Sequence, residues 1–124
     1  MKRTLFSLLV CLSFIPPIDA KSCDINGVWK HADKEAWLEI NTIMKNIVVK
    51  KHQKNSSAEG LTVIKHLLKK PQTLNTWQGK IYDASTDSFV EIEIKTNKCE
   101  VLTINHHKLE LFQLLKVQQG EEQR

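Results

Sequence analysis

Hydrophobic and polar residues alternate along most of the chain after residue 24. The clearest run, at residues 90–95, places Val90, Ile92 and Ile94 on one face and charged residues on the other. This period of two is typical of a half-buried antiparallel strand. Turn-forming residues separate further short runs of the same kind. Strands are therefore expected at residues 25–31, 36–43, 47–53, 77–83, 90–95, 99–105 and 109–117.

Residues 60–70 have a pattern that fits either a short helix or a strand. Leu61, Ile64 and Leu68 fall at helical spacing, and Pro71 ends the run. The lysines that precede this proline suit the C-terminus of a helix. The sequence therefore favours one short helix around residues 60–70, with a strand as the alternative.

Short strands linked by hairpins dominate the expected structure. Such a series in one small chain indicates a mainly β fold, either a sandwich or a small closed antiparallel barrel. Closure of the sheet would remove the exposed edges that a flat sheet leaves open. A small open sheet packed on the helix around residues 60–70 is the alternative fold.

The first 20 residues have the features of a secretory signal peptide. Lys2 and Arg3 precede an apolar stretch at residues 5–15, two prolines break it, and Ala20 is the small residue expected before the cleavage site. An uncleaved membrane anchor is the alternative. The prediction is a single β-barrel domain at residues 21–117, a polar frayed tail at residues 118–124, no transmembrane anchor after cleavage, and a periplasmic or secreted location.

Two cysteines, Cys23 and Cys99, follow the predicted cleavage site. In an exported protein, two thiols most often form one disulfide bond. A metal site that uses both thiols is the alternative, although the chain lacks the local C-x-x-C spacing that zinc sites prefer.

The formal net charge of +4 comes from lysine clusters. These residues are Lys50, Lys51 and Lys54, followed by Lys65, Lys69 and Lys70. Such clusters could bind an anionic envelope surface, for example lipid headgroups or an acidic polysaccharide, through the first three lysines in particular. A solvated strand and helix face explains the same lysines without a partner. Nucleic acid is not expected as a partner, because no recognition motif accompanies the lysines.

Three short motifs occur in an order that resembles a known family. They are Gly27-Val28-Trp29, Gly60-Leu61 followed by Val63-Ile64, and the stretch Trp77-Gln78-Gly79-Lys80-Ile81-Tyr82-Asp83. In this order they resemble domain-of-unknown-function family 2147, a family of small exported bacterial proteins. The resemblance implies a lipocalin-like β-barrel in the bacterial envelope and, by analogy of fold alone, an apolar ligand. The family has no established biochemical activity.

The chain shows no familiar catalytic pattern. The G-x-S-x-G, H-E-x-x-H and P-loop motifs are absent from the sequence. The five histidines are interpreted as turn or surface residues, since the sequence identifies no third ligand for a metal at His106 and His107. The prediction is a non-enzymatic protein without a metal or cofactor.

Aromatic residues are the candidates for a binding site. Trp37, Trp77 and Tyr82 are predicted to line a cavity for a small apolar or amphipathic ligand, with core packing as the equal alternative for the tryptophans. Trp29 is predicted to plug one end of the barrel. Two functional hypotheses follow: a carrier with an open cavity, and an interaction module with a filled core that binds a protein, lipid or glycan surface of the envelope.

Overall fold

The computed structural model describes residues 22–96 and 98–118. These residues form eight strands: β1 (Gly27–His31), β2 (Ala36–Asn41), β3 (Asn46–His52), β4 (Thr62–Lys69), β5 (Thr76–Asp83), β6 (Ser88–Lys95), β7 (Val101–His106) and β8 (Leu109–Lys116). A short 3-10 turn, η2 (Ser56–Ala58), is the only helical element within the described residues. The predicted signal peptide and residues 119–124 of the predicted tail lie outside them.

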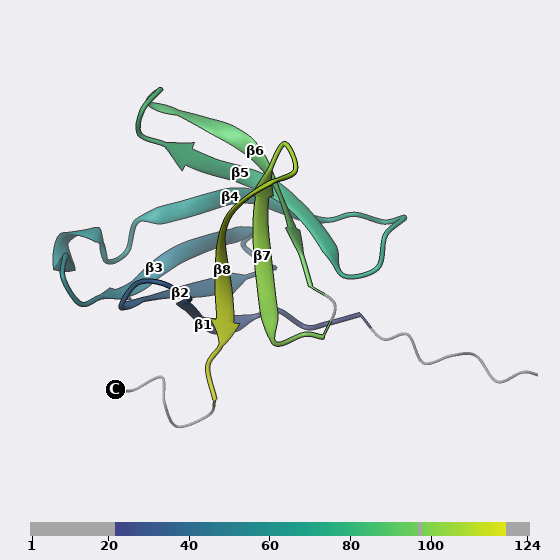
Figure 1. Ribbon diagram of the computed structural model, residues 1–124, viewed down its shortest axis with the longest axis horizontal. Coiled ribbons are helices and arrows are strands. Elements are labelled where there is room, and N and C mark those ends of the chain that lie inside the picture. Colours follow the sequence, from purple (N-terminus) through teal and green to yellow (C-terminus); the bar gives the residue numbers. More distant parts are fainter. Residues whose placement is uncertain (1–21, 97, 119–124) are drawn as a thin grey trace, which may run out of the picture.

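The strands form a closed antiparallel barrel (Figure 1). Each strand pairs with the next one along the chain, and β8 returns to pair with β1 from Trp29–Lys116 to His31–Leu114. The prediction of a mainly β, antiparallel barrel is therefore confirmed. The alternative of an open sheet is wrong, because the β1–β8 pairing removes the free edges of the first and last strands.

The predicted helix at residues 60–70 is wrong, because this segment forms β4. Ile64 and Leu67 are three residues apart, yet both side chains are buried inside the barrel, with 0 % and 2 % exposure. The register of β4 against β5 shifts beside His66, whose φ of 58° lies in the left-handed region. Such a bulge reverses the alternation of inward and outward side chains. Spacing that is typical of a helix therefore arises here in a bulged strand.

The barrel interior is filled by apolar side chains from all eight strands and from the segment before β1. The largest fully buried ones are Trp29, Ile25, Ile40, Ile47, Ile64, Ile94, Leu102, Ile104 and Leu114. Regular alternation places them inward, as on β6, where Ile92 and Ile94 are buried beside more exposed glutamates. Burial of each large side chain of this kind stabilises the fold by about 1.5–3 kcal/mol.

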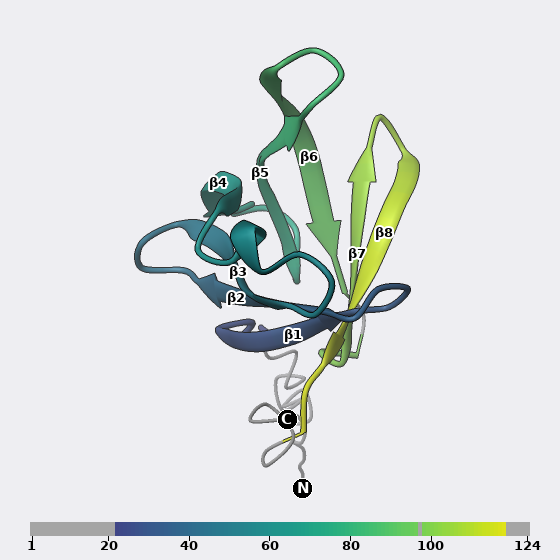
Figure 2. The ribbon, with the colours of Figure 1, turned by 90° about the vertical axis from the view of Figure 1, so that its left-hand side faces the viewer.

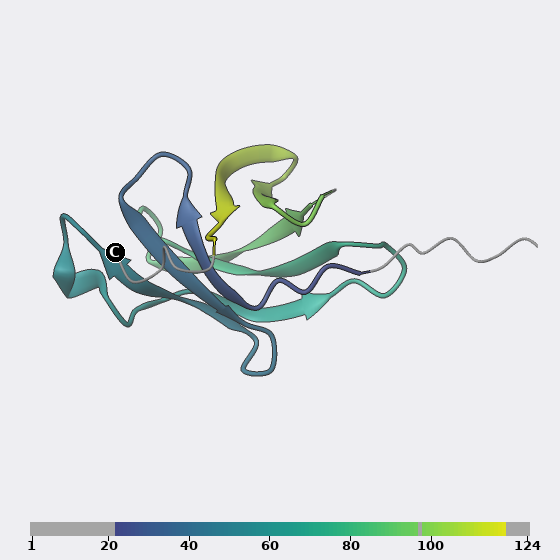
Figure 3. The ribbon, with the colours of Figure 1, turned by 90° about the horizontal axis from the view of Figure 1, so that it is seen from below.

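The segment before β1 covers one end of the barrel. Trp29 is buried there, and its indole Nε1 donates a hydrogen bond of 2.9 Å to the carbonyl of Ile25. The backbone amide of Cys23 donates to the side chain of Asn75 at 2.7 Å, which ties this segment to the β4–β5 loop. Figure 3 shows the two segments side by side at this end of the molecule. The position of Trp29 agrees with the predicted plug.

The structure joins Cys23 and Cys99 in a disulfide, with their Cα atoms 5.4 Å apart. The bond connects the segment before β1 to the segment before β7, across a sequence separation of 76 residues. The predicted cysteine pairing is confirmed.

Candidate functional site

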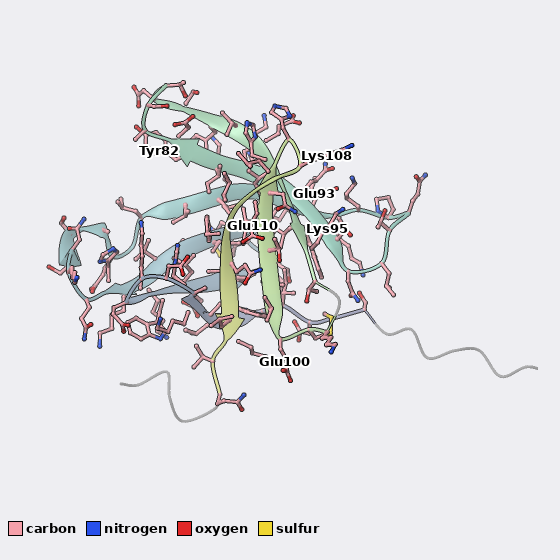
Figure 4. The ribbon with its side chains drawn as sticks, viewed as in Figure 1. Tyr82, Glu93, Lys95, Glu100, Lys108 and Glu110 are labelled. Carbon is pink, nitrogen blue, oxygen red and sulfur yellow. A yellow bond between two sulfur atoms is a disulfide. The ribbon has the colours of Figure 1, made fainter. Side chains whose placement is uncertain are left out.

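The three residues predicted to line a ligand cavity do not meet in one place. Trp77 is buried in the core with 4 % exposure. Tyr82 lies five positions further along β5, so its side chain points to the opposite face of the sheet, where it is exposed. Its hydroxyl donates a hydrogen bond of 2.7 Å to Asp87. Figure 4 shows Tyr82 at the free end of the β5–β6 hairpin, away from Glu93 and Lys95.

Trp37 lies on the outer face of β2, and two lysines approach its ring. The ammonium nitrogens of Lys30 and Lys51 lie 5.8 Å and 5.6 Å from the ring centroid. Both distances fall within the range of a cation–π interaction. The half-buried indole is therefore covered by side chains of the neighbouring strands and does not line the barrel interior.

The cationic side chains gather on β3, β4 and β5, which are neighbours in the barrel. Residues 40–82 contain eight lysines and a single acidic residue, Glu59. We call this surface, formed by the outer faces of β3–β5 and their adjoining turns, the basic wall. Its lysines are Lys45, Lys50, Lys51, Lys54, Lys65, Lys69, Lys70 and Lys80.

Two lysines of the basic wall face each other directly. In the register of β4 and β5, Lys65 lies opposite Lys80. Like charges in directly opposite positions destabilise an antiparallel pair. The Nζ atom of Lys65 lies 4.0 Å from the centroid of Phe89 on β6, so a cation–π contact partly offsets this repulsion.

Acidic residues of β6 mark the edge of the basic wall. Glu91 lies opposite Lys80 in the β5–β6 register. Glu93 forms an ion pair of 2.8 Å with Lys70 and one of 3.5 Å with Lys95. The hydrogen bond from Lys70 holds the pKa of the Glu93 carboxyl below its ordinary value. These pairs are partly exposed, so each contributes little to stability.

A shallow groove runs along this edge of the wall. One hollow of about 240 Å³ lies over the β4 bulge, and a second of about 280 Å³ lies towards the β7–β8 turn. The two hollows share Gln78, Glu91 and Ile92. The first is also lined by His66, Leu68, Gly79 and Lys80, and the second by Lys70, Glu93, Asn105, His107 and Lys108. Both hollows are open to solvent, and polar and apolar atoms line them in nearly equal parts.

The histidines are distributed over several elements. The ring of His31 stacks on Phe112 with centroids 4.9 Å apart, and burial holds the pKa of His31 below its ordinary value. His106 and His107 are in ring contact, with centroids 4.1 Å apart, and the Nδ1 atom of His106 lies 2.8 Å from the carbonyl oxygen of Glu91. Within residues 22–96 and 98–118, no group of three or more potential ligands converges to hold a metal ion.

Sequence reasoning identified six of the eight wall lysines but not the wall itself. Lys50, Lys51 and Lys54 lie at one end of β3 and in the loop after it, as the strand assignment predicted. The incorrect helix at residues 60–70 separated the second lysine cluster from the first. Lys45 and Lys80 were missed, although the near absence of acidic residues over residues 40–82 is visible in the sequence.

Comparisons of the chain with family models, curated proteins and solved structures find no match. The resemblance to domain-of-unknown-function family 2147 therefore stays a prediction. In the part of the chain that the structure describes, no helix has the length and apolar character needed to cross a membrane.

Proposed function

We propose that this protein is an exported interaction module with a filled core, which docks its basic wall on an anionic surface of the cell envelope. The observation that carries the proposal is the segregation of charge, with eight lysines and one acidic residue over residues 40–82. Strands β3, β4 and β5 place these lysines on adjacent parts of one surface. Their fields therefore add over distances comparable to the Debye length, about 8 Å at physiological ionic strength.

The packing of the interior supports a docking surface rather than a carrier. Nine large side chains in the barrel have less than 2 % exposure, and Trp77 packs among them. A carrier would need an apolar cavity that buries most of its ligand. The hollows beside the wall are open rather than enclosed, and polar and apolar atoms share their lining about equally. A lysine near an anionic membrane surface contributes about 1 kcal/mol to binding, so several acting together suffice for docking.

The Lys65–Lys80 pair supports the proposal independently of the total charge. Opposed like charges cost stability. An acidic residue at position 65 would replace this repulsion with attraction. The pair is therefore understandable if both lysines serve an anionic partner.

The test is retention of the full-length mature protein on immobilised dextran sulfate, a polyanion that contains no lipid. The double variant Lys65→Glu/Lys80→Glu reverses two charges of the wall. It keeps a like-charged pair between β4 and β5 and also replaces the Lys80–Glu91 pair with a like-charged one. The control variant Lys108→Glu/Lys116→Glu changes the net charge equally, at the β7–β8 hairpin. Near-ultraviolet circular dichroism of each variant verifies the fold.

We expect the wall variant to elute at a much lower salt concentration than the wild-type protein, and the control variant to elute close to it. Equal losses in the two variants would show that net charge alone determines retention, which would refute a specific docking wall. Weak retention of the wild-type protein itself would refute it as well.

A further inference from the structure

The turn between β2 and β3 exposes two large apolar side chains. Ile43 is 88 % exposed and Met44 is 66 % exposed. Turns of this kind normally contain Gly, Pro, Asn, Asp or Ser, for reasons of backbone conformation and local hydrogen bonding. Neither Ile43 nor Met44 serves such a purpose, so their exposure is not explained by the geometry of the turn.

Asparagine side chains hold this turn in a defined conformation. The Oδ1 atom of Asn41 accepts hydrogen bonds from the backbone amides of Ile43 and Met44, at 3.0 Å and 2.9 Å. The Oδ1 atom of Asn26 accepts from the backbone amide of Thr42 at 2.7 Å and from its hydroxyl at 3.1 Å. The two apolar side chains therefore project from a preorganised turn, which lowers the entropy cost of any contact they make.

Two lysines of the basic wall adjoin this turn. Lys45 directly follows Met44, and its carbonyl accepts a hydrogen bond of 3.0 Å from the backbone amide of Leu67 on β4. Lys65 lies opposite Asn46 in the β3–β4 register. Figure 2 shows the turn on the side of the barrel where β3 and β4 run, opposite the β7–β8 hairpin. The apolar tip therefore adjoins the part of the basic wall that contains Lys45 and Lys65.

We propose that the β2–β3 turn inserts Ile43 and Met44 into the headgroup region of an anionic lipid bilayer, while the lysines of the basic wall lie against the lipid phosphates. The inference rests on the proposed function and names its partner. A bilayer is the occupant that matches both features, because membrane-surface binding combines buried apolar side chains with attraction between cations and anionic lipids. A protein pocket could accept the two side chains, but it would not by itself account for the extended cationic surface beside them.

The test is cosedimentation of the mature protein with phosphatidylcholine vesicles that contain or lack phosphatidylglycerol. The tip variant is Ile43→Ser/Met44→Ser. The matched control is Leu109→Ser/Leu111→Ser, which removes two exposed apolar side chains, 67 % and 42 % exposed, from the β7–β8 hairpin. Retention on dextran sulfate is measured for the same proteins, because it measures binding by the lysines in the absence of lipid.

We expect the wild-type protein and the control to bind vesicles that contain phosphatidylglycerol. The tip variant should bind them at least about tenfold more weakly, given the apolar surface that each truncation removes. Its retention on dextran sulfate should be unchanged. In a Met44→Trp variant, brominated lipids should quench the added fluorescence, as expected for a side chain inside the bilayer.

Two results would overturn the inference while leaving the proposed function intact. The first is vesicle binding by the tip variant equal to that of the wild-type protein. The second is self-association of the wild-type protein that the tip variant loses, since the turn would then be a contact between copies of this chain. Weak retention of the wild-type protein on dextran sulfate would instead refute the proposed function.

Discussion

Reduction of the Cys23–Cys99 disulfide should remove a large part of the stability of the barrel. The bond closes a loop with a sequence separation of 76 residues. For a loop of this length, the chain-entropy relation predicts a contribution of about 4.5 kcal/mol to the free energy of unfolding. Typical domains have a total of about 5–15 kcal/mol. The bond also anchors the segment that covers Trp29, because Cys23 belongs to the buried core cluster.

The assay is urea denaturation of the mature protein, followed by tryptophan fluorescence, with and without a reducing agent. With an m-value of about 1–2 kcal/mol/M, the midpoint should fall by about 2–4 M on reduction. The variant Cys23→Ala/Cys99→Ala should behave like the reduced wild-type protein, apart from a small loss of packing at the buried Cys23. Reduction changes no side-chain volume, so it isolates the cross-link from the packing.

A change of less than about 1 kcal/mol on reduction would refute this reasoning. It would mean that the denatured chain is already compact enough for the bond to constrain little. Faster hydrogen exchange at the Trp29 indole, with an unchanged global midpoint, would restrict the role of the bond to the covered end of the barrel.

Three further predictions concern single positions in the barrel. In Gly79→Ala, the new Cβ would lie 2.9 Å from the Cγ2 atom of Ile64. Overpacking should therefore lower the free energy of unfolding, measured by urea denaturation, by about 1–3 kcal/mol. A decrease below about 0.5 kcal/mol would contradict this close packing. Trp29→Phe leaves the carbonyl of Ile25 without the indole that donates to it at 2.9 Å. Thermal unfolding should show a decrease of about 1–3 kcal/mol in the free energy of unfolding. Unchanged stability would mean that water replaces the indole as the donor. Burial lowers the pKa of His31 from its ordinary value of 6.5, so the unfolded chain binds this proton more readily, and stability should fall as the pH drops through 6.5 towards the lower folded pKa. Melting temperatures across this range should show a smaller decrease in His31→Gln, and an identical decrease would assign the effect to other groups.

Most of the strands could be predicted because alternation records which face of a strand is buried. On β6, the isoleucines at positions 92 and 94 are buried while the glutamates at 91 and 93 are more exposed. The pairing of the two cysteines followed from their number and the expected export. The exception was β4, where the backbone of His66 adopts a positive φ without a glycine to signal it. A bulge depends on how the strand pairs with its neighbours, and a local sequence pattern carries no information about that pairing.

The candidate site was harder to predict than the fold, because it depends on which strands are neighbours. Lys65 and Lys80 are fifteen positions apart in the sequence. Only the β4–β5 register brings them opposite each other. The aromatic candidates are separated in the structure for a similar reason. Trp77 and Tyr82 lie on one strand but on opposite faces, and Trp37 lies on the outside of β2.

Three departures from local consistency involve the basic wall and the turn beside it. Lys65 faces Lys80 across the sheet, Lys45 has a φ of 61°, and Ile43 and Met44 project from a hydrogen-bonded turn. Each feature costs stability or solubility, and each has a simple remedy: an acidic residue, a glycine or asparagine, and a polar pair. A sequence that specifies its fold consistently tends to break such rules where function requires it. A bilayer partner accounts for the opposed lysines and the exposed apolar tip together, because both would meet the same anionic interface. The positive φ of Lys45 follows from the geometry of the turn that presents Ile43 and Met44.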